Sequence, residues 1–277
     1  MSAQEKGPVD ERQGDQQLSP SAIKYLAALD QLKGTVTHNV HTLLKDLVHT
    51  KTDQFLDMIV LNDGRRIDHL DDIVEGKVSL ELESLYEECS PTTAKDASVS
   101  DHHRMENSFD NSLVYGEVEF ASFLNILKFF PKSKGGVFYD LGSGAGRAIF
   151  TVRFTLDFDR CIGIELLPNL HKLAVDVTKV YDQKFRHKLA SRSVEFYCED
   201  VLKYDWSDGT VIFACSTCFT DDLINAIGEQ AKDLHQGAYL ITLKKFADID
   251  PDAFDIIQEA ACPMSWGDAD VFVYRRR

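Results

Sequence analysis

The chain has 277 residues, of which 44% are hydrophobic, and a formal net charge of −15. This length and apolar content exclude a fibrous or wholly disordered protein and allow one catalytic domain with an accessory segment. The acidic balance argues against direct binding to nucleic acid, which requires a basic face, and favours a basic protein as partner.

The N-terminal residues and the apolar runs bear on the location of the protein. Residues 1–20 are polar and lack the apolar centre of a secretory signal, so they predict a disordered tail. The longest apolar runs, such as Phe55–Val60 and Val137–Tyr139, are far shorter than the roughly 18 residues that cross a bilayer. We therefore expect a soluble, intracellular protein, in the nucleus or the cytoplasm, with no membrane partner.

The six cysteines predict neither a disulfide framework nor a metal site. They are spread along the chain, and several lie in apolar runs where a reduced thiol behaves as a small hydrophobic side chain. Cys215 and Cys218 have the spacing of half a zinc site or of a redox pair, but no second pair of cysteines or histidines accompanies them. We expect no bound metal.

Residues 21–106 predict a helical N-terminal region followed by a linker. Apolar residues recur there at the spacing of one helix face: Val36, Val40, Leu43, Leu44, Leu47, Phe55 and Met58. A polar stretch then runs from Ser90 to about His103, which predicts a linker or mobile loop. The adjacent residues His102 and His103 lack any ligand spacing, so we expect them to be exposed to solvent.

From residue 107 to residue 277 the pattern changes to short β-rich runs that alternate with amphipathic helical stretches, which predicts parallel strands joined by right-handed crossovers. The first five runs are Val137–Asp140, Cys161–Glu165, Val194–Glu199, Thr210–Ser216 and Ala238–Leu243. Two further runs, Phe254–Ala261 and Val271–Tyr274, are separated by residues 262–270 and not by a helix, so they predict an antiparallel hairpin at the sheet edge. Five parallel strands followed by such a hairpin are the arrangement of the seven-stranded class I methyltransferases, an α/β Rossmann-like fold.

The best local signal is a buried strand that runs into a glycine-rich turn, residues 137–146, followed by a helix over Arg147–Phe154. Glycines permit positive φ at such a turn and let a ligand approach the backbone. Asp140 precedes the first glycine, and Glu165 ends the next strand, where a carboxylate can accept both hydroxyls of a ribose. Together they predict a nucleoside ligand.

The acidic residues at this turn bear on the choice between a dinucleotide and S-adenosylmethionine. A pyrophosphate-binding motif usually lacks the preceding acid, whereas Asp140 favours a cationic ligand with a sulfonium and an amino group. Glu199 and Asp200, at the end of the third strand, could place a carboxylate beside the adenine amino group. We therefore expect a methyltransferase that depends on S-adenosylmethionine.

Three segments then carry a specific resemblance: residues 114–117 (Val-Tyr-Gly-Glu), 140–144 (Asp-Leu-Gly-Ser-Gly) and 163–165 (Gly-Ile-Glu). In this order they resemble the disruptor-of-telomeric-silencing (Dot-one) family, the histone-lysine methyltransferases that lack a SET domain. The similarity continues through residues 211–213 with Phe219, 244–246 and 265–266, and it covers roughly residues 107–274. It implies a transferase that methylates a lysine of a protein, such as a histone in chromatin.

The resemblance also implies a role for individual positions. Tyr115, Gly116 and Glu117 resemble the loop that folds over the methionine part of the cofactor. The other cofactor-binding positions that it implies are Asp140, Gly142, Ser143, Gly144, Gly146, Glu165, Asp200, Val201 and Ser216. The positions that it implies in catalysis or in a narrow lysine channel are Tyr115, Ser216, Phe219, Phe246 and Trp266.

One segment departs from the family pattern. After the fourth strand the family carries paired asparagines before its aromatic residue, whereas this chain has Ala-Cys-Ser-Thr-Cys-Phe at residues 214–219. Ser216 stands at the second asparagine; its hydroxyl can bond an amine but lacks the second arm of the amide. The same segment lacks the Asn/Asp-Pro-Pro-aromatic turn of base amino-group methyltransferases, which argues against nucleic acid as the acceptor.

Two other interpretations stay open. One is a small-molecule or other nitrogen methyltransferase with the same cofactor half, and the other is a catalytically silent fold that serves as an interaction module. The intact positions 115–117, 140–146 and Glu165 argue against the second. Methyl transfer needs a lone pair aligned opposite the sulfur–carbon bond, and a lysine has to arrive neutral, which an apolar aromatic channel favours by desolvation. We expect no residue that must act as a general base.

Overall fold

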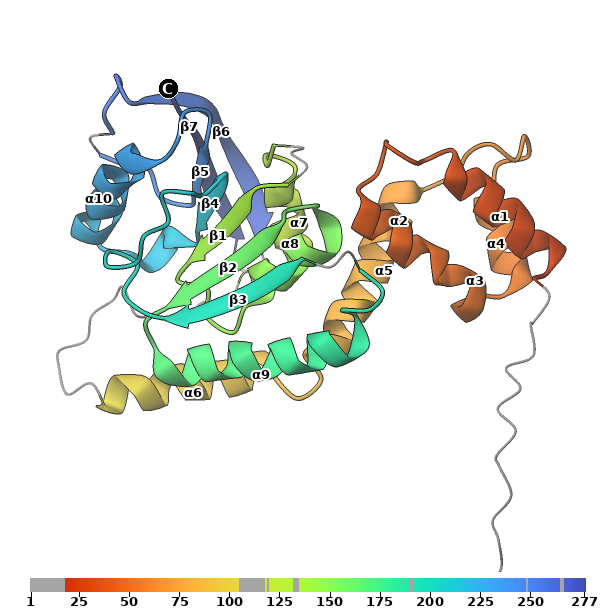
Figure 1. Ribbon diagram of the computed structural model, residues 1–277, viewed down its shortest axis with the longest axis horizontal. Coiled ribbons are helices and arrows are strands. Elements are labelled where there is room, and N and C mark those ends of the chain that lie inside the picture. The colour runs from red at the N-terminus through yellow and green to blue at the C-terminus, as the bar shows by residue number, and fades with distance from the viewer. Residues whose placement is uncertain are drawn as a thin grey trace, which may run out of the picture.

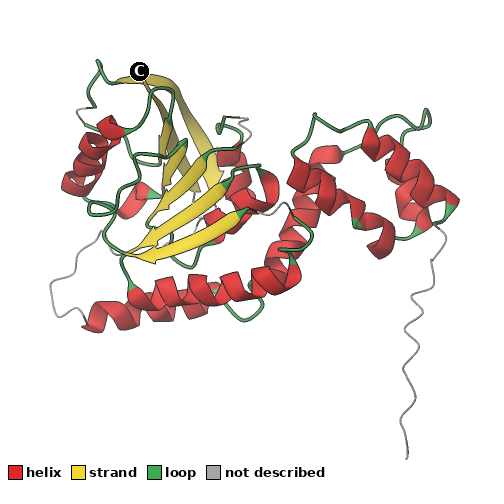
Figure 2. Ribbon diagram, viewed as in Figure 1, coloured by secondary structure: helices red, strands yellow, loops and turns green. Residues whose placement is uncertain are grey.

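The computed structural model describes residues 18–104, 118, 120–131, 135–189, 192–247, 249–264 and 267–277. Within these residues the chain forms a helical N-terminal region beside an α/β region that is built on one sheet (Figure 1, Figure 2). Tyr115–Glu117 and Trp266, which the family resemblance implies at the site, lie outside the described residues, as does the expected start of the catalytic domain at residue 107.

Several N-terminal helices are capped at their start by a residue with a hydroxyl side chain, because the hydroxyl accepts a hydrogen bond from a backbone N–H that the helix leaves unpaired. Ser19 Oγ accepts from Ala22 N, Thr37 Oγ1 accepts from Val40 N, and Thr52 caps a third helix in the same way. The helices described in this region are α1 (Pro20–Asp30), α2 (His38–Lys45), α3 (Leu47–Thr50), α4 (Asp53–Ile59), α5 (Leu70–Leu85) and α6 (Pro91–Arg104). None of the helices that the structure describes is long and apolar enough to span a membrane.

Helix α6 shows that the predicted linker between Ser90 and His103 is wrong. Ser90 Oγ accepts a hydrogen bond from Thr93 N at 3.1 Å and caps the helix. The sequence does not indicate this helix, because the buried residues of the helix are small or polar and produce no apolar periodicity. These residues are Ala94, Ser98 and Asp101. His103 is exposed as expected, whereas His102 is half-buried.

Seven strands form one sheet in the described part of the chain, in the order β3-β2-β1-β4-β5-β7-β6. Strands β1 to β5 are mutually parallel, and β7 runs antiparallel to both β5 and β6. This confirms the predicted class I arrangement of five parallel strands and an edge hairpin. The strands are β1 (Val137–Leu141), β2 (Arg160–Glu165), β3 (Ser193–Cys198), β4 (Val211–Ala214), β5 (Tyr239–Thr242), β6 (Phe254–Met264) and β7 (Gly267–Arg276).

The hairpin strands are longer than the sequence predicts. Strand β6 continues to Met264 and β7 begins at Gly267, through most of the expected separator. Pro263 suggested an earlier end, because proline cannot donate to a sheet ladder. Strand β6 is an edge strand, where proline is tolerated, so the pairing continues past it.

Different helices cover the two faces of the sheet, since successive side chains of a strand point to opposite faces. Phe138 and Phe213 face the core that contains Phe123 of α7 and Ile149 of α8. On the opposite face, Tyr139, Ile212 and Leu240 pack with residues of α10. The helices of this region are α7 (Phe120–Leu127), α8 (Arg147–Thr155), α9 (Pro168–Lys184) and α10 (Asp221–Gln230), with the short 3-10 helices η2 (Ser216–Cys218) and η3 (Ala231–Asp233).

The N-terminal region is attached to the end of α8 by hydrogen bonds of the buried side chains Asn39 and Asp157. Asn39 Nδ2 donates to Arg153 O at 2.8 Å and to Leu156 O at 3.1 Å. Asp157 Oδ2 accepts from His38 N at 2.8 Å, at the start of α2. Because α8 begins at the glycine-rich turn, the N-terminal helices are fixed to an element that leads directly to the predicted site.

Candidate active site

The glycine-rich turn after β1 lies where the strand order reverses, with β2 on one side of β1 and β4 on the other. Ligands of open α/β sheets bind at this point, outside the carboxyl ends of the strands. Gly142, Gly144 and Gly146 have φ angles of 81°, 53° and 86°, in the region where a side chain is strained. A Cβ at Gly146 would also lie 2.5 Å from the Phe196 ring, so the turn has no room for a larger residue there.

Glu165 connects the two loops that border this point. Its side chain is buried; Oε2 accepts a hydrogen bond from Gly144 N and Oε1 accepts one from Leu167 N, both at 2.8 Å. Burial raises the pKa of Glu165, and the bonds from backbone N–H groups oppose that shift. Each carboxylate oxygen has two lone pairs, so the side chain can accept further bonds from ribose hydroxyls.

Asp140 is a buried carboxyl group that has no countercharge among the described residues. Its side chain is 3% exposed and has no hydrogen-bond or ion-pair partner among the residues that the structure describes. Burial, and to a smaller extent the charge of Glu165, raise the pKa of Asp140 to about 8. Such a group is protonated at neutral pH until a cation lies beside it. The electrostatics of the turn therefore suit a positively charged ligand.

Ser143 carries an unpaired polar atom at the same turn. Its Oγ is buried and has no hydrogen-bond partner within the described residues. Native proteins leave few such atoms unpaired, so each one calls for a ligand, a water or a functional explanation. Taken with Asp140 and Glu165, this donor and acceptor set fits a ligand with a cationic part and a ribose. A dinucleotide fits less well, because its pyrophosphate brings negative charge to the turn and no cation that could pair with Asp140.

Asp200 and Val201 follow β3 at the same edge of the sheet. The Asp200 carboxylate is partly exposed and accepts a hydrogen bond from Leu202 N at 3.0 Å, while Val201 belongs to the core. Glu199 is exposed, and its backbone N–H donates to Glu165 O at 3.1 Å. These residues are therefore close to Glu165 in the fold, and their contact with adenine, like that of Glu165 with ribose, stays a prediction.

The segment after β4 carries two predicted residues, Ser216 and Phe219, of which Phe219 reaches the turn. The strand ends at Ala214, two residues earlier than predicted, and the chain then forms η2. Ser216 is fully buried, and its Oγ accepts a hydrogen bond from Leu243 N at 3.1 Å, which ties this segment to the end of β5. Phe219 is half-buried, and its ring lies 3.2 Å from the position of a Cβ on Gly142. Phe219 thus packs directly against the glycine-rich turn.

Phe246 lies in the core. It is 3% exposed, its ring centroid is 5.1 Å from that of Tyr274, and a Cβ on Gly228 of α10 would lie 2.9 Å from the ring. These contacts support a structural role for Phe246 in place of the channel wall that the resemblance implies. Of the aromatic residues implied at the acceptor site, Phe219 is the one that the described part of the structure brings to the turn.

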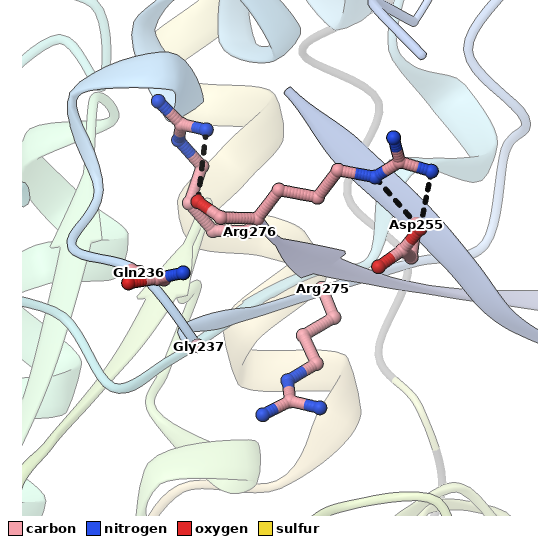
Figure 3. A pocket seen from close by; sticks show the side chains of 6 residues that line it. Gln236, Gly237, Asp255, Arg275 and Arg276 are labelled. Atoms are coloured by element: carbon pink, nitrogen blue, oxygen red, sulfur yellow. Dashed lines mark hydrogen bonds and ion pairs between the residues drawn. The ribbon is translucent and has the colours of Figure 1, made fainter. Parts of the chain in front are cut away.

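A hollow at the opposite edge of the sheet is lined by Gln236, Gly237, Asp255, Arg275, Arg276 and Arg277 (Figure 3). Gly237 precedes β5 and Arg275 is near the end of β7, so the hollow lies at the amino ends of the parallel strands, away from Asp140. Arg277 Nη2 is 2.6 Å from Asp255 Oδ1. Nε of Arg276 donates to a backbone carbonyl at 3.0 Å. These arginines hold the end of β7, and the hollow is separate from the candidate site.

Two residues of the N-terminal region contact the cofactor loops, and no sequence motif marks them. Tyr86 Oη donates to Ala145 O at 3.0 Å, within the glycine-rich turn. Asp101 Oδ2 accepts from Asn169 N at 2.7 Å, in the first turn of α9. Tyr86 directly follows a helix and Asp101 lies in the expected linker, so only the tertiary structure identifies them.

The sheet order is that of the class I methyltransferases, whose cofactor is S-adenosylmethionine. The chain belongs to the family described as "Histone methylation protein DOT1", which matches residues 97–260, more than half of the chain. This confirms the resemblance that the sequence motifs indicate. The matched range begins within α6, so it includes the end of the N-terminal helical region.

Among curated proteins no match is found. Solved structures of similar fold include an RNA methyltransferase from Salinibacter ruber in complex with S-adenosylhomocysteine, at 23% identity over 58% of this chain and 94% of that one, with a TM-score of 0.41. The N-methyltransferase NodS from Bradyrhizobium japonicum, also with S-adenosylhomocysteine, matches at 13% identity over 65% of this chain and 98% of that one, with a TM-score of 0.46. Magnesium protoporphyrin IX methyltransferase from Synechocystis, with bound S-adenosylmethionine, matches at 11% identity over 66% and 97%, with a TM-score of 0.42.

Proposed function

We propose that the protein is a lysine N-methyltransferase whose acceptor is a basic protein, such as a histone. The observation that supports this most is the membership of a family described by histone methylation, over residues 97–260. The net charge of −15 suits a basic acceptor, because opposite charges favour encounter, and it disfavours direct binding to nucleic acid. A histone acceptor implies that the protein acts inside the cell, in the nucleus or the cytoplasm.

Within this proposal the cofactor half of the site has a defined division of roles. Asp140 pairs with the cationic part of the cofactor, and Glu165 accepts the ribose hydroxyls. Asp200 and Val201 contact the adenine. The glycines at 142, 144 and 146 let the ligand approach the backbone, and the unpaired Oγ of Ser143 gains a partner.

When bound, S-adenosylmethionine supplies a methyl group that its sulfonium has already activated. The chain then has to orient the cofactor, align the acceptor and exclude water, so that positioning supplies most of the rate. Phe219 places an apolar ring beside Gly142, where the acceptor would approach. An apolar surrounding lowers the pKa of an entering lysine because it disfavours the ammonium form, so the amine can attack without a general base.

A small-molecule or other nitrogen methyltransferase is the second candidate, and the acceptor half of the site favours it. Ser216 replaces an amide of the family pattern, and its hydroxyl already accepts a bond from Leu243 N. Phe246 is packed in the core. The acceptor side therefore departs from the family further than the cofactor side does.

The test is transfer of a labelled methyl group from S-adenosylmethionine to purified core histones and to a cell extract, followed by mass spectrometry of proteins, nucleic acids and small metabolites. The Glu165→Ala variant, which should lose cofactor affinity, is the control for label that the protein does not transfer. Methylated lysine that appears with the parent and disappears with the variant supports the proposal. Label confined to small metabolites or nucleic acid, with no modified lysine, would overturn the lysine assignment and favour the second candidate.

A further inference from the structure

Helices α5 and α6 approach the cofactor site from the N-terminal region. Figure 1 shows α6 running alongside α9, and these two helices are in contact. The segment between α5 and α6 carries Tyr86 and Cys89, and α6 carries Asp101. Tyr86 and Asp101 are both buried, and each one reaches a different loop of the cofactor site.

Tyr86 holds the glycine-rich turn after β1. Its Oη donates a hydrogen bond to Ala145 O at 3.0 Å, and Ala145 lies between Gly144 and Gly146. The guanidinium of Arg147 lies 4.3 Å from the centre of the Tyr86 ring, and its Nη2 donates to Cys89 O at 3.1 Å. The turn is therefore bound to the N-terminal region through a backbone carbonyl and through the first side chain of α8.

This contact matters because the turn is rich in glycine. Glycine has more conformational freedom than other residues, and a glycine-rich loop loses that freedom when it binds a ligand. A hydrogen bond to Ala145 O restrains the peptide group that joins Ala145 to Gly146. A ligand then binds a turn that already has the required geometry.

Asp101 holds the second loop, after β2. Its two carboxylate oxygens accept from Asn169 N and from Asn169 Nδ2, both at 2.7 Å. Asn169 lies in the first turn of α9, two residues after Leu167, whose backbone N–H donates to Glu165. Asp101 thus anchors the loop that orients the ribose-binding carboxylate.

We propose that Tyr86 is a positioning residue for cofactor binding, and that together with Asp101 it makes α5 and α6 a brace that holds both cofactor loops in their binding geometry. The proposal rests on the assignment of the S-adenosylmethionine site to the glycine-rich turn and Glu165. It gives the N-terminal region a role in cofactor affinity that is distinct from acceptor recognition.

The experiment compares two variants that each remove one buried hydroxyl group. Tyr86→Phe removes the bond to the turn, and Tyr25→Phe is the matched control, because Tyr25 Oη donates to Leu44 O, also at 3.0 Å, within the core of α1 to α4. Calorimetry with S-adenosylhomocysteine and thermal unfolding without ligand are measured on the full chain. Both variants should lower Tm, but only Tyr86→Phe should raise the Kd, by about three- to tenfold, the loss expected for one buried hydrogen bond. The KM for S-adenosylmethionine should rise with it while kcat changes little, because the brace acts on binding.

Asp101→Asn is a second variant, which replaces one acceptor oxygen by an amide donor. It should weaken S-adenosylhomocysteine binding by a factor similar to that of Tyr86→Phe. The brace is overturned if Tyr86→Phe binds S-adenosylhomocysteine as tightly as the parent, or if Tyr25→Phe weakens binding equally. The Glu165→Ala variant distinguishes an error in the brace from an error in the cofactor site. If it loses affinity while Tyr86→Phe does not, the cofactor site stands and the brace alone is overturned. If it too binds normally, the cofactor lies elsewhere and both assignments are overturned.

Discussion

Replacing Asp140 with asparagine tests whether this buried carboxyl group recognises the cationic part of the cofactor. Burial and the charge of Glu165 raise the pKa of Asp140 to about 8, so most of the ligand-free protein carries a proton there at pH 7. That proton has to leave before the carboxylate can pair with a cation, at a cost of about 1.4 kcal/mol at pH 7. The apparent affinity for S-adenosylmethionine should therefore rise about tenfold from pH 6 to pH 7 and flatten above pH 8.

The Asp140→Asn variant keeps the shape of the side chain and removes the titrating group. At pH 8 it should bind S-adenosylmethionine roughly ten- to hundredfold more weakly than the parent, because bonds to a charged group contribute about 1.5 to 3 kcal/mol. The difference should narrow toward pH 6, where the parent is protonated as well. Calorimetry from pH 6 to pH 9, in two buffers of different ionisation enthalpy, measures both the affinity and the protons released.

Two results would refute this reasoning. The first is a parent protein that releases no proton on binding at pH 7, because the raised pKa of Asp140 requires nearly one. The second is an Asp140→Asn variant whose affinity changes with pH as steeply as that of the parent. Either result would assign the pH dependence to another group.

Four further outcomes are expected, one for Asp140→Asn and one for each of three other substitutions. Because the pKa of Asp140 is raised in the ligand-free fold, its contribution to stability is fully present below about pH 4 and is lost as the pH rises through about 8. At pH 8 the Asp140→Asn variant should therefore have a higher Tm than the parent. Glu165→Ala should weaken S-adenosylhomocysteine binding by roughly ten- to hundredfold in calorimetry; unchanged affinity would place the ribose elsewhere. Phe246→Ala should lower the free energy of unfolding, measured with denaturant, by about 3 to 5 kcal/mol, because it removes a buried aromatic side chain. A variant of unchanged stability with slow methyl transfer would instead support the channel role. Ser216→Ala should lower stability by about 1 to 3 kcal/mol, because it leaves the N–H of Leu243 without its partner; equal stability in the same assay would contradict this.

The cofactor half of the site was predictable because its determinants are local. The left-handed turn requires glycines, and the strand before it and the acid after the next strand are placed by the βαβ unit. Asp140, Gly142 and Glu165 therefore occupy the positions that their spacing indicates. The seven strands followed from the hydrophobic pattern, apart from their ends. Strand β4 ends early where η2 begins, and β6 continues past Pro263 to Met264.

The remaining features depend on contacts between distant parts of the chain. Helix α6 buries small and polar residues, so its sequence resembles a linker although Asp101 is fixed to Asn169. Phe246 and Phe219 both follow a strand end and look equivalent in sequence. The packing of α10 against the sheet buries the first, while the second reaches Gly142. No pattern along the chain distinguishes these two environments.

Among the residues that the structure describes, the proposed acceptor side has few hydrogen-bonding groups with which to recognise a substrate. The Ser216 hydroxyl is fully buried and already accepts a bond from Leu243 N, so an incoming amine can use it only if η2 moves. The backbone carbonyl of Phe219 likewise accepts a bond from Lys244 Nζ at 2.8 Å. The Phe219 ring, by contrast, lies against the glycine-rich turn. In the proposed lysine methyltransferase, this ring would attract a cationic amine and would then favour its neutral form as water is excluded. Shape and desolvation at this ring, more than hydrogen bonding at Ser216, should therefore decide which acceptor is methylated.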